Sequence, residues 1–504
     1  MAISLQPEYL KRYKDIAQLF WKYGRGDLLT HSGITFPLDG EAKATEASGQ
    51  PEELARDLEA MGPLYIKLGQ LLSSRVDLLP APYIHALSRL QDNLPPFSFA
   101  EVEQIVEAEL GVRMSKAFES FESTPIASAS LGQVHRAKLR DGRDVAVKVQ
   151  RPGVREEIAK ELSALRDIAE FLDHHTELGE QYRFVQTLDE LQHSLARELD
   201  YVREAKNLVE IGHNLQEFDR IIIPQPVEDY CTARVLTMDY IQGRKITEIG
   251  PLAQLSMDGK QIAEQLFQAY LKQILVDGLF HADPHPGNIF LTNDYHLALL
   301  DLGMTGRLSP SMQEELLKLL LAVSEGKGDA ATRIGISIGE RVSEKTIAEA
   351  ELSHRVSQVL EERMAGSIER MQVGLALMDF SRICLDNGFR MPIELTMLGK
   401  TLLNLDTVGR ILDPTFDPSK AIQREAFRLT QRRLTKSLTP ANLLASAIEA
   451  KEFTLELPRR VNKILDALAK NELTFRVDAI EEDTLIDGFQ KIANRIATGL
   501  ILAA

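Results

Sequence analysis

The chain lacks the features that define several protein classes. Its 504 residues include only two cysteines, Cys231 and Cys384, which lie far apart, so a CxxC metal site and a disulfide framework are excluded. A reducing compartment is the simplest setting for such a chain. No run of about 18 apolar residues occurs, so we expect no complete transmembrane helix. The N-terminus has no charged segment followed by an apolar run, so we expect no signal peptide.

Basic residues are also in deficit. Lys and Arg number 58 against 74 Asp and Glu, which gives a formal net charge of −16 and argues against nucleic acid as a partner. The 44% of hydrophobic and 26% of charged residues are ordinary for a globular protein. The final segment, 496–504, is apolar and follows Arg495. It is either a helix end or the start of a membrane-seeking segment.

The hydrophobic pattern predicts helices over residues 1–115, which we take as an N-terminal helical extension. Glu52–Leu79 has the 3.6-residue spacing of a long helix. Pro63 lies within it and is expected to kink or restart the helix, because proline removes a backbone donor.

Residues 116–240 predict a small lobe built on a hairpin. Gln133–Leu139 and Asp144–Val149 alternate as strands do, and Asp141-Gly142 between them is a strong turn signal. Two helices and two short strands are expected to follow, at 153–175, 184–215, 220–224 and 233–238.

Residues 241–430 predict a mostly helical large lobe, and 431–504 a helical tail. A helix at 258–277 leads to a polar loop and then to a second hairpin, whose last strand ends at Asp301. A mostly β small lobe before a mostly α large lobe is the layout of protein kinases. We therefore predict an α+β, bilobal protein-kinase-like fold with an N-terminal helical extension and a helical C-terminal tail.

The polar loop has the sequence His-Ala-Asp-Pro-His-Pro-Gly-Asn. Its Asp283 and Asn288 have the spacing of the catalytic aspartate and the metal-binding asparagine of kinases. Asp301 precedes Leu-Gly and so matches the position of the Asp-x-Gly aspartate that binds Mg²⁺ in kinases. Mg²⁺ prefers the carboxylate and amide oxygens that Asp301 and Asn288 provide. Two other interpretations stay open: a polar turn without chemistry, and a metal site formed by His281 and His285.

A lysine and a small-residue loop complete the phosphate-binding pattern. Lys148, in Val-Ala-Val-Lys, matches the kinase lysine that pairs with the α- and β-phosphates. The loop before it keeps only the third glycine of the kinase G-x-G-x-x-G-x-V pattern, Gly132, with Val134 following. Ala127 and Ala129 stand at the other glycine positions, and their Cβ atoms hinder close approach to phosphate. A solvated strand edge and a plain turn are the alternatives.

Together these residues and three further motifs resemble the pattern of a known protein family. The chain resembles the UbiB/AarF/ADCK family of atypical kinase-like proteins, densely over about residues 60–310 and loosely to about 415. Lys67-Leu68-Gly69-Gln70 is similar to the KxGQ motif of that family, 127–135 to its alanine-rich loop, and Glu198-Leu199-Asp200 to its ExD motif.

The resemblance implies roles for particular residues. Lys67, Gln70, Glu198 and Asp200 would regulate access to the site, with the KxGQ helix packed over the nucleotide cleft. Glu204 would pair with Lys148 and act with it and Asp283 in catalysis, although Glu161 on the preceding helix competes for that pairing. The residues implied to bind ATP are Ala127, Ala129, Gly132, Val134, Lys148, Met238, Asp239 and Tyr240.

The resemblance also implies a function. We expect an Mg²⁺-dependent ATPase that binds ATP and ADP and supports the biosynthesis of ubiquinone or another prenyl lipid at the cytoplasmic side of a membrane. A lipid or quinone-precursor ligand is expected, and nucleic acid is not. Two alternatives stay open: a phosphotransferase acting on a protein or small-molecule hydroxyl, and a nucleotide-binding pseudokinase scaffold.

Overall fold

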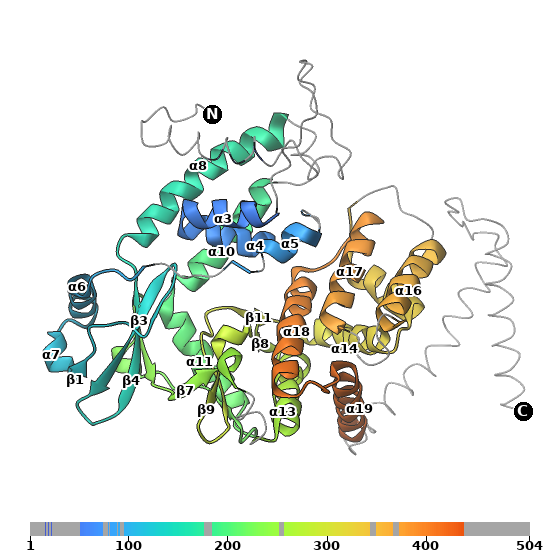
Figure 1. Ribbon diagram of the computed structural model, residues 1–504. Helices are drawn as coiled ribbons and strands as arrows, with labels where there is room; N and C mark the ends of the chain where they lie inside the picture. The colour runs from blue at the N-terminus through green and yellow to red at the C-terminus, as the bar shows by residue number, and fades with distance from the viewer. Residues whose placement is uncertain are drawn as a thin grey trace, which may run out of the picture. The chain divides into compact units, whose positions relative to one another are not determined.

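The structure is a computed structural model (Figure 1). Apart from a few single positions, it describes residues 51–73, 81–87, 95–175, 184–250, 257–342, 349–365 and 372–437. The chain divides into two compact units, residues 1–427 and 428–504, and both lobes lie in the first unit. The apolar segment 496–504 and the predicted tail beyond residue 437 lie outside the described residues.

The small lobe contains one five-stranded sheet. Its central strands, β3 (Gly132–Leu139) and β4 (Asp144–Gln150), pair antiparallel along their length, and Gly142 at the turn has the positive φ of 90° that this hairpin requires. The predicted hairpin is therefore confirmed. In spatial order the sheet contains β1 (Phe118–Phe121), β3 (Gly132–Leu139), β4 (Asp144–Gln150) and β6 (Val235–Asp239), with β2 (Ala127–Ser128) also paired to β3.

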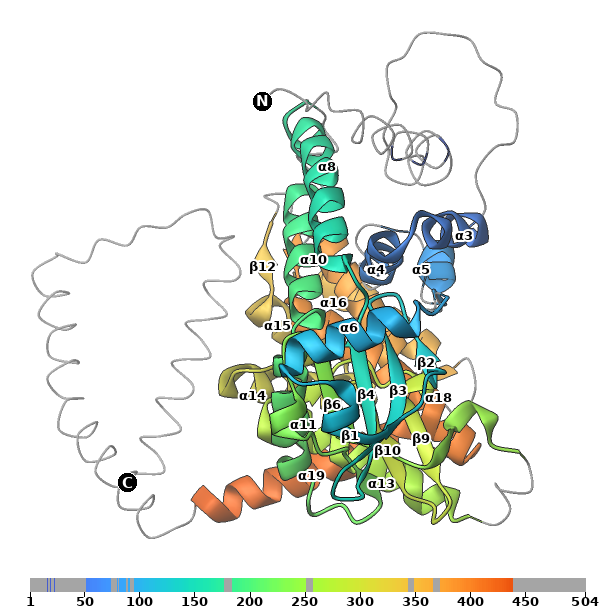
Figure 2. The ribbon, with the colours of Figure 1, turned by 90° about the vertical axis from the view of Figure 1, so that its left-hand side faces the viewer.

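Helix α6 (Phe99–Leu110) lies across this sheet (Figure 2). A capping box between Ser98 and Glu101 begins it, and Gly111 in the left-handed conformation ends it. Val102 and Val106 are fully buried in one cluster with apolar residues of the sheet. The helix thus packs as part of the small lobe, although it precedes residue 115.

Within the described residues, the helical extension contains α3 (Pro51–Met61), α4 (Pro63–Leu72) and α5 (Ala81–Leu87). Gly62, at φ 112°, separates the first two helices, and Pro63 restarts the chain as a helix where its missing N–H costs nothing. The predicted restart is confirmed, but the helix ends at Leu72 rather than Leu79.

The extension packs on two long helices, α8 (Val154–His175) and α10 (Phe184–Glu198), which lie side by side in Figures 1 and 2. One apolar cluster joins all of them. Leu131, from the alanine-rich loop, belongs to the same cluster as Leu64 of α4 and Leu195 of α10. The extension therefore packs on the small lobe beside the alanine-rich loop.

The prediction of a single helix over 184–215 is wrong, because the chain breaks between α10 and α11 (Tyr201–Asn214). Asp200 caps α11 by accepting a hydrogen bond from Arg203 N, which favours a new helix start over continuation. The carbonyl of Leu199 instead accepts from Gln150 Nε2 at 3.1 Å. Glu198 and Glu204 consequently lie on different helices.

In the large lobe, a π-helical turn extends α13 (Gly259–Lys272) to Asp277. The predicted second hairpin is confirmed as β9 (Ile289–Thr292) and β10 (Leu297–Leu299). It belongs to a four-stranded sheet that β5 (Ile221–Ile222) and β7 (Gly243–Lys245) complete. Strands β8 (Leu279–His281) and β11 (Thr305–Arg307) form a separate pair.

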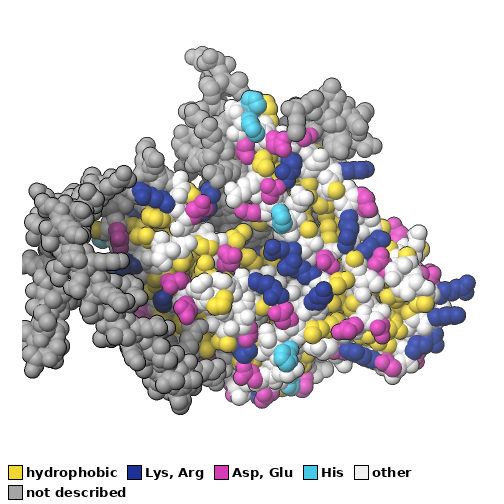
Figure 3. All heavy atoms as spheres, turned by 180° about the vertical axis from the view of Figure 1, so that it is seen from behind, with side chains coloured by type: hydrophobic (Ala, Val, Ile, Leu, Met, Phe, Trp, Pro, Cys, Tyr) yellow, Lys and Arg dark blue, Asp and Glu magenta, His cyan; other side chains and the backbone are white. Residues whose placement is uncertain are grey.

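Helices make up most of the remainder. They are α14 (Pro310–Ser324), α15 (Gly328–Ile338), α16 (Glu349–Ala365), α17 (Val373–Asp386), α18 (Ile393–Leu412) and α19 (Pro418–Ser437), with one short strand pair, β12 (Glu340–Arg341) and β13 (Phe389–Arg390). The fold is α+β, bilobal and kinase-like, with a helical N-terminal extension. On the face in Figure 3, the Lys and Arg side chains of the described residues are interspersed with acidic and hydrophobic ones.

Candidate active site

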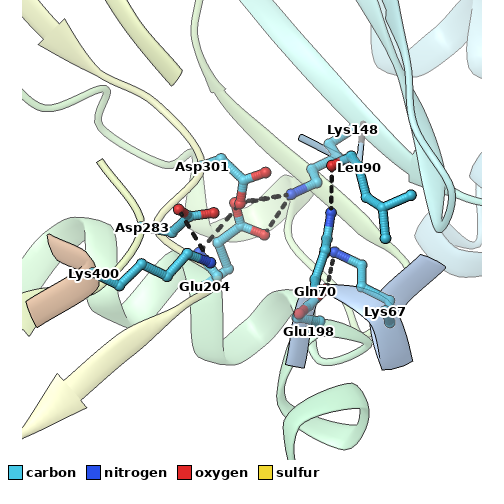
Figure 4. A network of polar contacts seen from close by, with 10 residues as sticks. Lys67, Gln70, Leu90, Lys148, Glu198, Glu204, Asp283, Asp301 and Lys400 are labelled. Atoms are coloured by element: carbon cyan, nitrogen blue, oxygen red, sulfur yellow. Dashed lines mark hydrogen bonds and ion pairs between the residues drawn. The ribbon is translucent and has the colours of Figure 1, made fainter. Parts of the chain in front are cut away.

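The centre of the site is a lysine shared between two carboxylates (Figure 4). Nζ of Lys148, on β4, lies 2.9 and 3.1 Å from the carboxylate oxygens of Glu204 and 3.4 Å from Oδ1 of Asp301. Glu204 is only 2% exposed. The predicted pairing of Lys148 with Glu204 is confirmed across 56 residues of sequence. Glu161 is buried on α8, whereas the carboxylates that the Lys148 ammonium contacts are Glu204 and Asp301.

Burial and the neighbouring charges together shift the pKa of each of the three groups. Burial raises the pKa of Glu204 to about 7; Lys148 opposes this shift, and the nearby charge of Asp301 adds to it. Burial alone would lower the pKa of Lys148, but Asp301 and Glu204 outweigh burial and raise that pKa well above its ordinary value. The Lys148 charge holds the pKa of Asp301 below its ordinary value, although 51% of the Asp301 side chain is exposed. Asp301 therefore stays ionised and suits a cation.

Backbone geometry turns the Asp301 carboxylate toward Lys148. Asp301 has a φ of 56°, in the left-handed region that aspartate tolerates better than most residues. Gly303 N contacts its Oδ1 at 3.4 Å, and the Asn207 side chain donates to Leu302 O at 3.0 Å. Asn207 lies one helical turn after Glu204, so α11 positions both the lysine and the loop that follows Asp301.

The predicted Mg²⁺ ligands fit that ion. Leu300 N donates to Asn288 O at 2.9 Å, which holds the Asn288 backbone beside the chain entering Asp301. A carboxylate and an amide oxygen are hard donors, and Mg²⁺ usually takes one or two carboxylates with water and phosphate oxygens completing its octahedron. Asn288 and Asp301 would hold the ion in that way; their roles remain predictions.

The two histidines of the loop do not form a metal site. His281 is fully buried, which lowers its pKa, and its Nδ1 lies 3.4 Å from Met304 O. His285 is exposed, and its Nδ1 accepts from Gly287 N at 3.1 Å. Within the described part of the chain, no group of three or more His, Cys, Asp or Glu could hold a metal. The histidine-metal interpretation therefore has no geometric support.

Helix α18 contacts the loop at Asp283, which sequence reasoning missed. Asn404 Nδ2 donates to Asp283 Oδ1 at 3.3 Å, Lys400 Nζ lies 3.8 Å from the same oxygen, and Thr401 Oγ1 donates to Ala282 O at 3.0 Å. No local pattern links the two segments. Polar residues at positions 400, 401 and 404, among the buried Leu398, Leu402 and Leu405 of α18, were the available signal.

The alanine-rich loop is a tight turn between β2 and β3. Ala129 N donates to Gly132 O at 2.7 Å, and Arg151 N donates to Leu131 O at 2.8 Å. A Cβ atom on Gly132 would lie 2.6 Å from Val149 O and 2.7 Å from the Tyr201 hydroxyl. Packing alone therefore favours glycine at position 132, because the backbone there lies close to β4 and Tyr201.

This contact yields a stability prediction. Gly132→Ala should lower the free energy of unfolding by about 1–3 kcal/mol, because the new methyl group must displace backbone of the central strand. Chemical denaturation measures the change. The control is Gly250→Ala, whose Cβ would meet no atom within 4 Å. Equal stability of the two variants would contradict the packing role.

The KxGQ segment contacts the ExD segment directly. Lys67 Nζ lies 2.7 Å from Glu198 Oε2, and Gln70 Nε2 donates to Leu90 O at 3.2 Å. A Cβ on Gly69 would lie 2.3 Å from Leu90 Cδ1, so the glycine allows α4 to approach that residue closely. The Lys67 charge also helps to lower the pKa of Asp301, which places α4 within electrostatic reach of the site.

Two of the residues predicted to bind ATP at the end of β6, Asp239 and Tyr240, contact arginine side chains. Arg143 Nε donates to Asp239 Oδ1 at 2.8 Å, and the Arg136 guanidinium lies 4.6 Å from the ring centre of Tyr240. Met238 is buried in the sheet. Nucleotide contacts by Met238, Asp239 and Tyr240 remain a prediction.

Comparison with known proteins agrees with this geometry. The profile of the ABC1 atypical kinase-like domain matches residues 89–334, and that of the UbiB helical domain matches 356–417. An uncharacterized protein of Synechocystis, sll1770, is 32% identical over 87% of this chain and 75% of its own length. A protein of Cellvibrio japonicus named Probable protein kinase UbiB is 34% identical over 73% of this chain and 67% of its own. The Arabidopsis thaliana protein ACTIVITY OF BC1 COMPLEX KINASE 7, chloroplastic, is 34% identical over 84% and 61%, respectively. The chain belongs to the ABC1/UbiB family of atypical kinase-like proteins, as the motif resemblance predicted.

Proposed function

We propose that the chain binds ATP with Mg²⁺ and hydrolyses it, and that this ATPase activity supports the biosynthesis of ubiquinone or another prenyl lipid at a membrane. The observation that carries the proposal is the Lys148 ammonium shared between Glu204 and Asp301. It is the arrangement with which kinases hold the α- and β-phosphates beside the metal. Asn288 and Asp301 would hold Mg²⁺, whose charge offsets that of the phosphates. Asp283 orients the attacking water and takes its proton.

The N-terminal extension favours hydrolysis over phosphorylation of a protein. Lys67 and Glu198 form an ion pair whose side chains are 12% and 19% exposed, so α4 is fastened to α10 beside the site. Leu131, from the nucleotide loop, packs in the same apolar cluster as α4. A large protein substrate would have to displace this helix, whereas water would not.

The lipid part of the proposal comes from the family resemblance and the names of relatives. Among the described residues, no helix is both long and apolar enough to cross a bilayer. The test is ATP hydrolysis by the purified chain with and without anionic lipid vesicles and quinone-precursor-like phenols. We expect turnover to rise when either is present. Turnover that neither changes would overturn the lipid link and leave the ATPase proposal standing.

Transfer to a hydroxyl of another molecule is the second candidate function. Asp283 has 32% of its side chain exposed and could accept a proton from an alcohol as well as from water. A phosphotransfer screen on small hydroxyl compounds, run beside the hydrolysis assay, separates the two. A pseudokinase scaffold is disfavoured, because Lys148, Glu204 and Asp301 retain their ionic contacts.

The alanine positions of the loop give a further prediction. Ala127→Gly or Ala129→Gly should change the preference between ATP and ADP or release autophosphorylation, because glycine lets the loop approach the phosphates more closely. Binding of both nucleotides and incorporation of labelled phosphate measure this. Ser123→Gly, at an exposed position before β2, is the flexibility control. Unaltered binding without new activity in both alanine variants would contradict the prediction.

A further inference from the structure

The catalytic loop contains no lysine or arginine of its own. Between Asp283 and Asn288 stand two prolines, a histidine and a glycine. Phosphoryl transfer spreads negative charge over the transferred group, and the site must neutralise that charge. Two lysines near the site already have close carboxylate partners: Lys148 at 2.9 Å from Glu204, and Lys67 at 2.7 Å from Glu198.

Helix α18 brings a third lysine to Asp283 (Figure 4). The Lys400 side chain is 24% exposed, and its ammonium lies 3.8 Å from Asp283 Oδ1. That separation is longer than an ordinary charge-assisted hydrogen bond of about 2.8 Å. The ammonium can therefore turn to an oxygen of the γ-phosphoryl group at small cost. Lys148, paired with Glu204, is assigned to the α- and β-phosphates, and Lys67 is paired with Glu198.

The face of α18 toward the loop is polar at successive turns. Lys400 and Asn404 are four residues apart and share a face, and Thr401 lies beside them. Asn404 and Thr401 hydrogen-bond the loop at Asp283 and Ala282. The loop thus stays attached to α18 when the Lys400 ammonium moves.

Close packing fixes the position of α18. A Cβ on Gly374 of α17 would lie 2.5 Å from Gly399 O and 2.6 Å from Leu403 N, so the two helix backbones touch. Leu398 and Leu402 are buried on either side of Lys400. A site built on a packed helix holds its side chains more accurately than one on a loop.

We propose that Lys400 is the phosphate-binding cation of the transfer step, and that the helical region matched at 356–417 thereby contributes a catalytic residue. The proposal rests on the proposed ATPase function. In the step, the water oxygen forms a bond to the γ-phosphorus and the bond to the bridging oxygen of ADP breaks. The water proton goes to the Asp283 carboxylate. Lys400 binds an oxygen of the transferring phosphoryl group, and Asn404 is a positioning residue for Asp283.

The test compares Lys400→Met and Lys400→Arg with the wild-type chain. Binding of MgADP is measured with and without aluminium fluoride, which mimics the transferring phosphoryl group, alongside ATP turnover. Lys318→Met is the matched control, because Lys318 is an exposed lysine paired with Glu315 on α14. Transition-state mimics bind far more tightly than ground-state ligands only when the stabilising groups are present.

For Lys400→Met we expect kcat to fall roughly 10²-fold. The increase in MgADP affinity caused by aluminium fluoride should fall by a similar factor, whereas MgADP affinity without aluminium fluoride should not change. Lys400→Arg should recover part of both, since it keeps the charge but not the shape. Equal tightening in Lys400→Met and the wild type would overturn the role of Lys400 alone. If the wild-type protein does not hydrolyse ATP, and aluminium fluoride does not increase its affinity for MgADP, the proposed function itself is overturned. A loss of MgADP affinity in Lys400→Met as large as its loss of turnover would contradict the proposal and indicate that Lys400 has only a structural role.

Discussion

Asp283→Asn is expected to reduce ATP turnover by at least about 10²-fold while MgATP affinity stays within a few-fold of the wild type. The amide keeps the shape of the carboxylate and one oxygen for Asn404, but it cannot take the proton of the attacking water. Losing a general base of this kind costs about 10²–10⁴ in rate. Phosphate release measures turnover, and calorimetric titration measures affinity.

The control for this prediction is Asp219→Asn, an exposed aspartate after α11 that lies outside the site. It should hydrolyse ATP at the wild-type rate. Unchanged turnover in Asp283→Asn would remove the role assigned to this residue. Lost nucleotide affinity together with lost turnover would show that Asp283 supports the shape of the loop instead.

Lys148→Met is expected to abolish turnover and to destabilise the fold in a pH-dependent way. Without the ammonium, the buried Glu204 carboxyl lies beside Asp301 with no compensating charge, so its pKa should rise beyond the value of about 7 that it has with Lys148 present. A carboxyl whose folded pKa exceeds its unfolded pKa stabilises the fold at low pH, and that contribution is lost as pH rises through the folded pKa. Removing one partner of a buried pair costs about 3–5 kcal/mol.

The loss of unfolding free energy in Lys148→Met should therefore be small at pH 5 and approach this range above pH 8. Denaturation at both pH values measures it. The double variant Lys148→Met/Glu204→Gln should recover much of the stability, because the amide carries no charge to bury, yet regain no turnover. A destabilisation of equal size at both pH values would contradict the charge assignment.

The parts of the site that the sequence predicted are those encoded by short patterns. The Asp283–Asn288 spacing, the Asp141-Gly142 turn and the helix restart at Pro63 each depend on neighbouring residues. The Lys148–Glu204 pair joins residues 56 apart and was reached through family resemblance. Hydrophobic periodicity alone would not have chosen between Glu204 and Glu161.

Other features could not be predicted because they depend on tertiary packing or on a competing local interaction. The break before α11 occurs where Asp200 caps a new helix, although the apolar spacing continues across it. Asn404 reaches Asp283 across 121 positions, and no local pattern announces such a contact. Gly132 matches a phosphate-loop pattern, yet its nearest constraints are Val149 O and the Tyr201 hydroxyl.

Following γ-labelled ATP through one turnover with Mg²⁺ and the purified chain distinguishes hydrolysis from transfer to the protein. We expect the label to leave as inorganic phosphate in amounts equal to the ADP formed, and Asp283→Asn to release almost none in the same time. Label retained on the protein, or no conversion of ATP by the wild-type chain, would contradict this expectation.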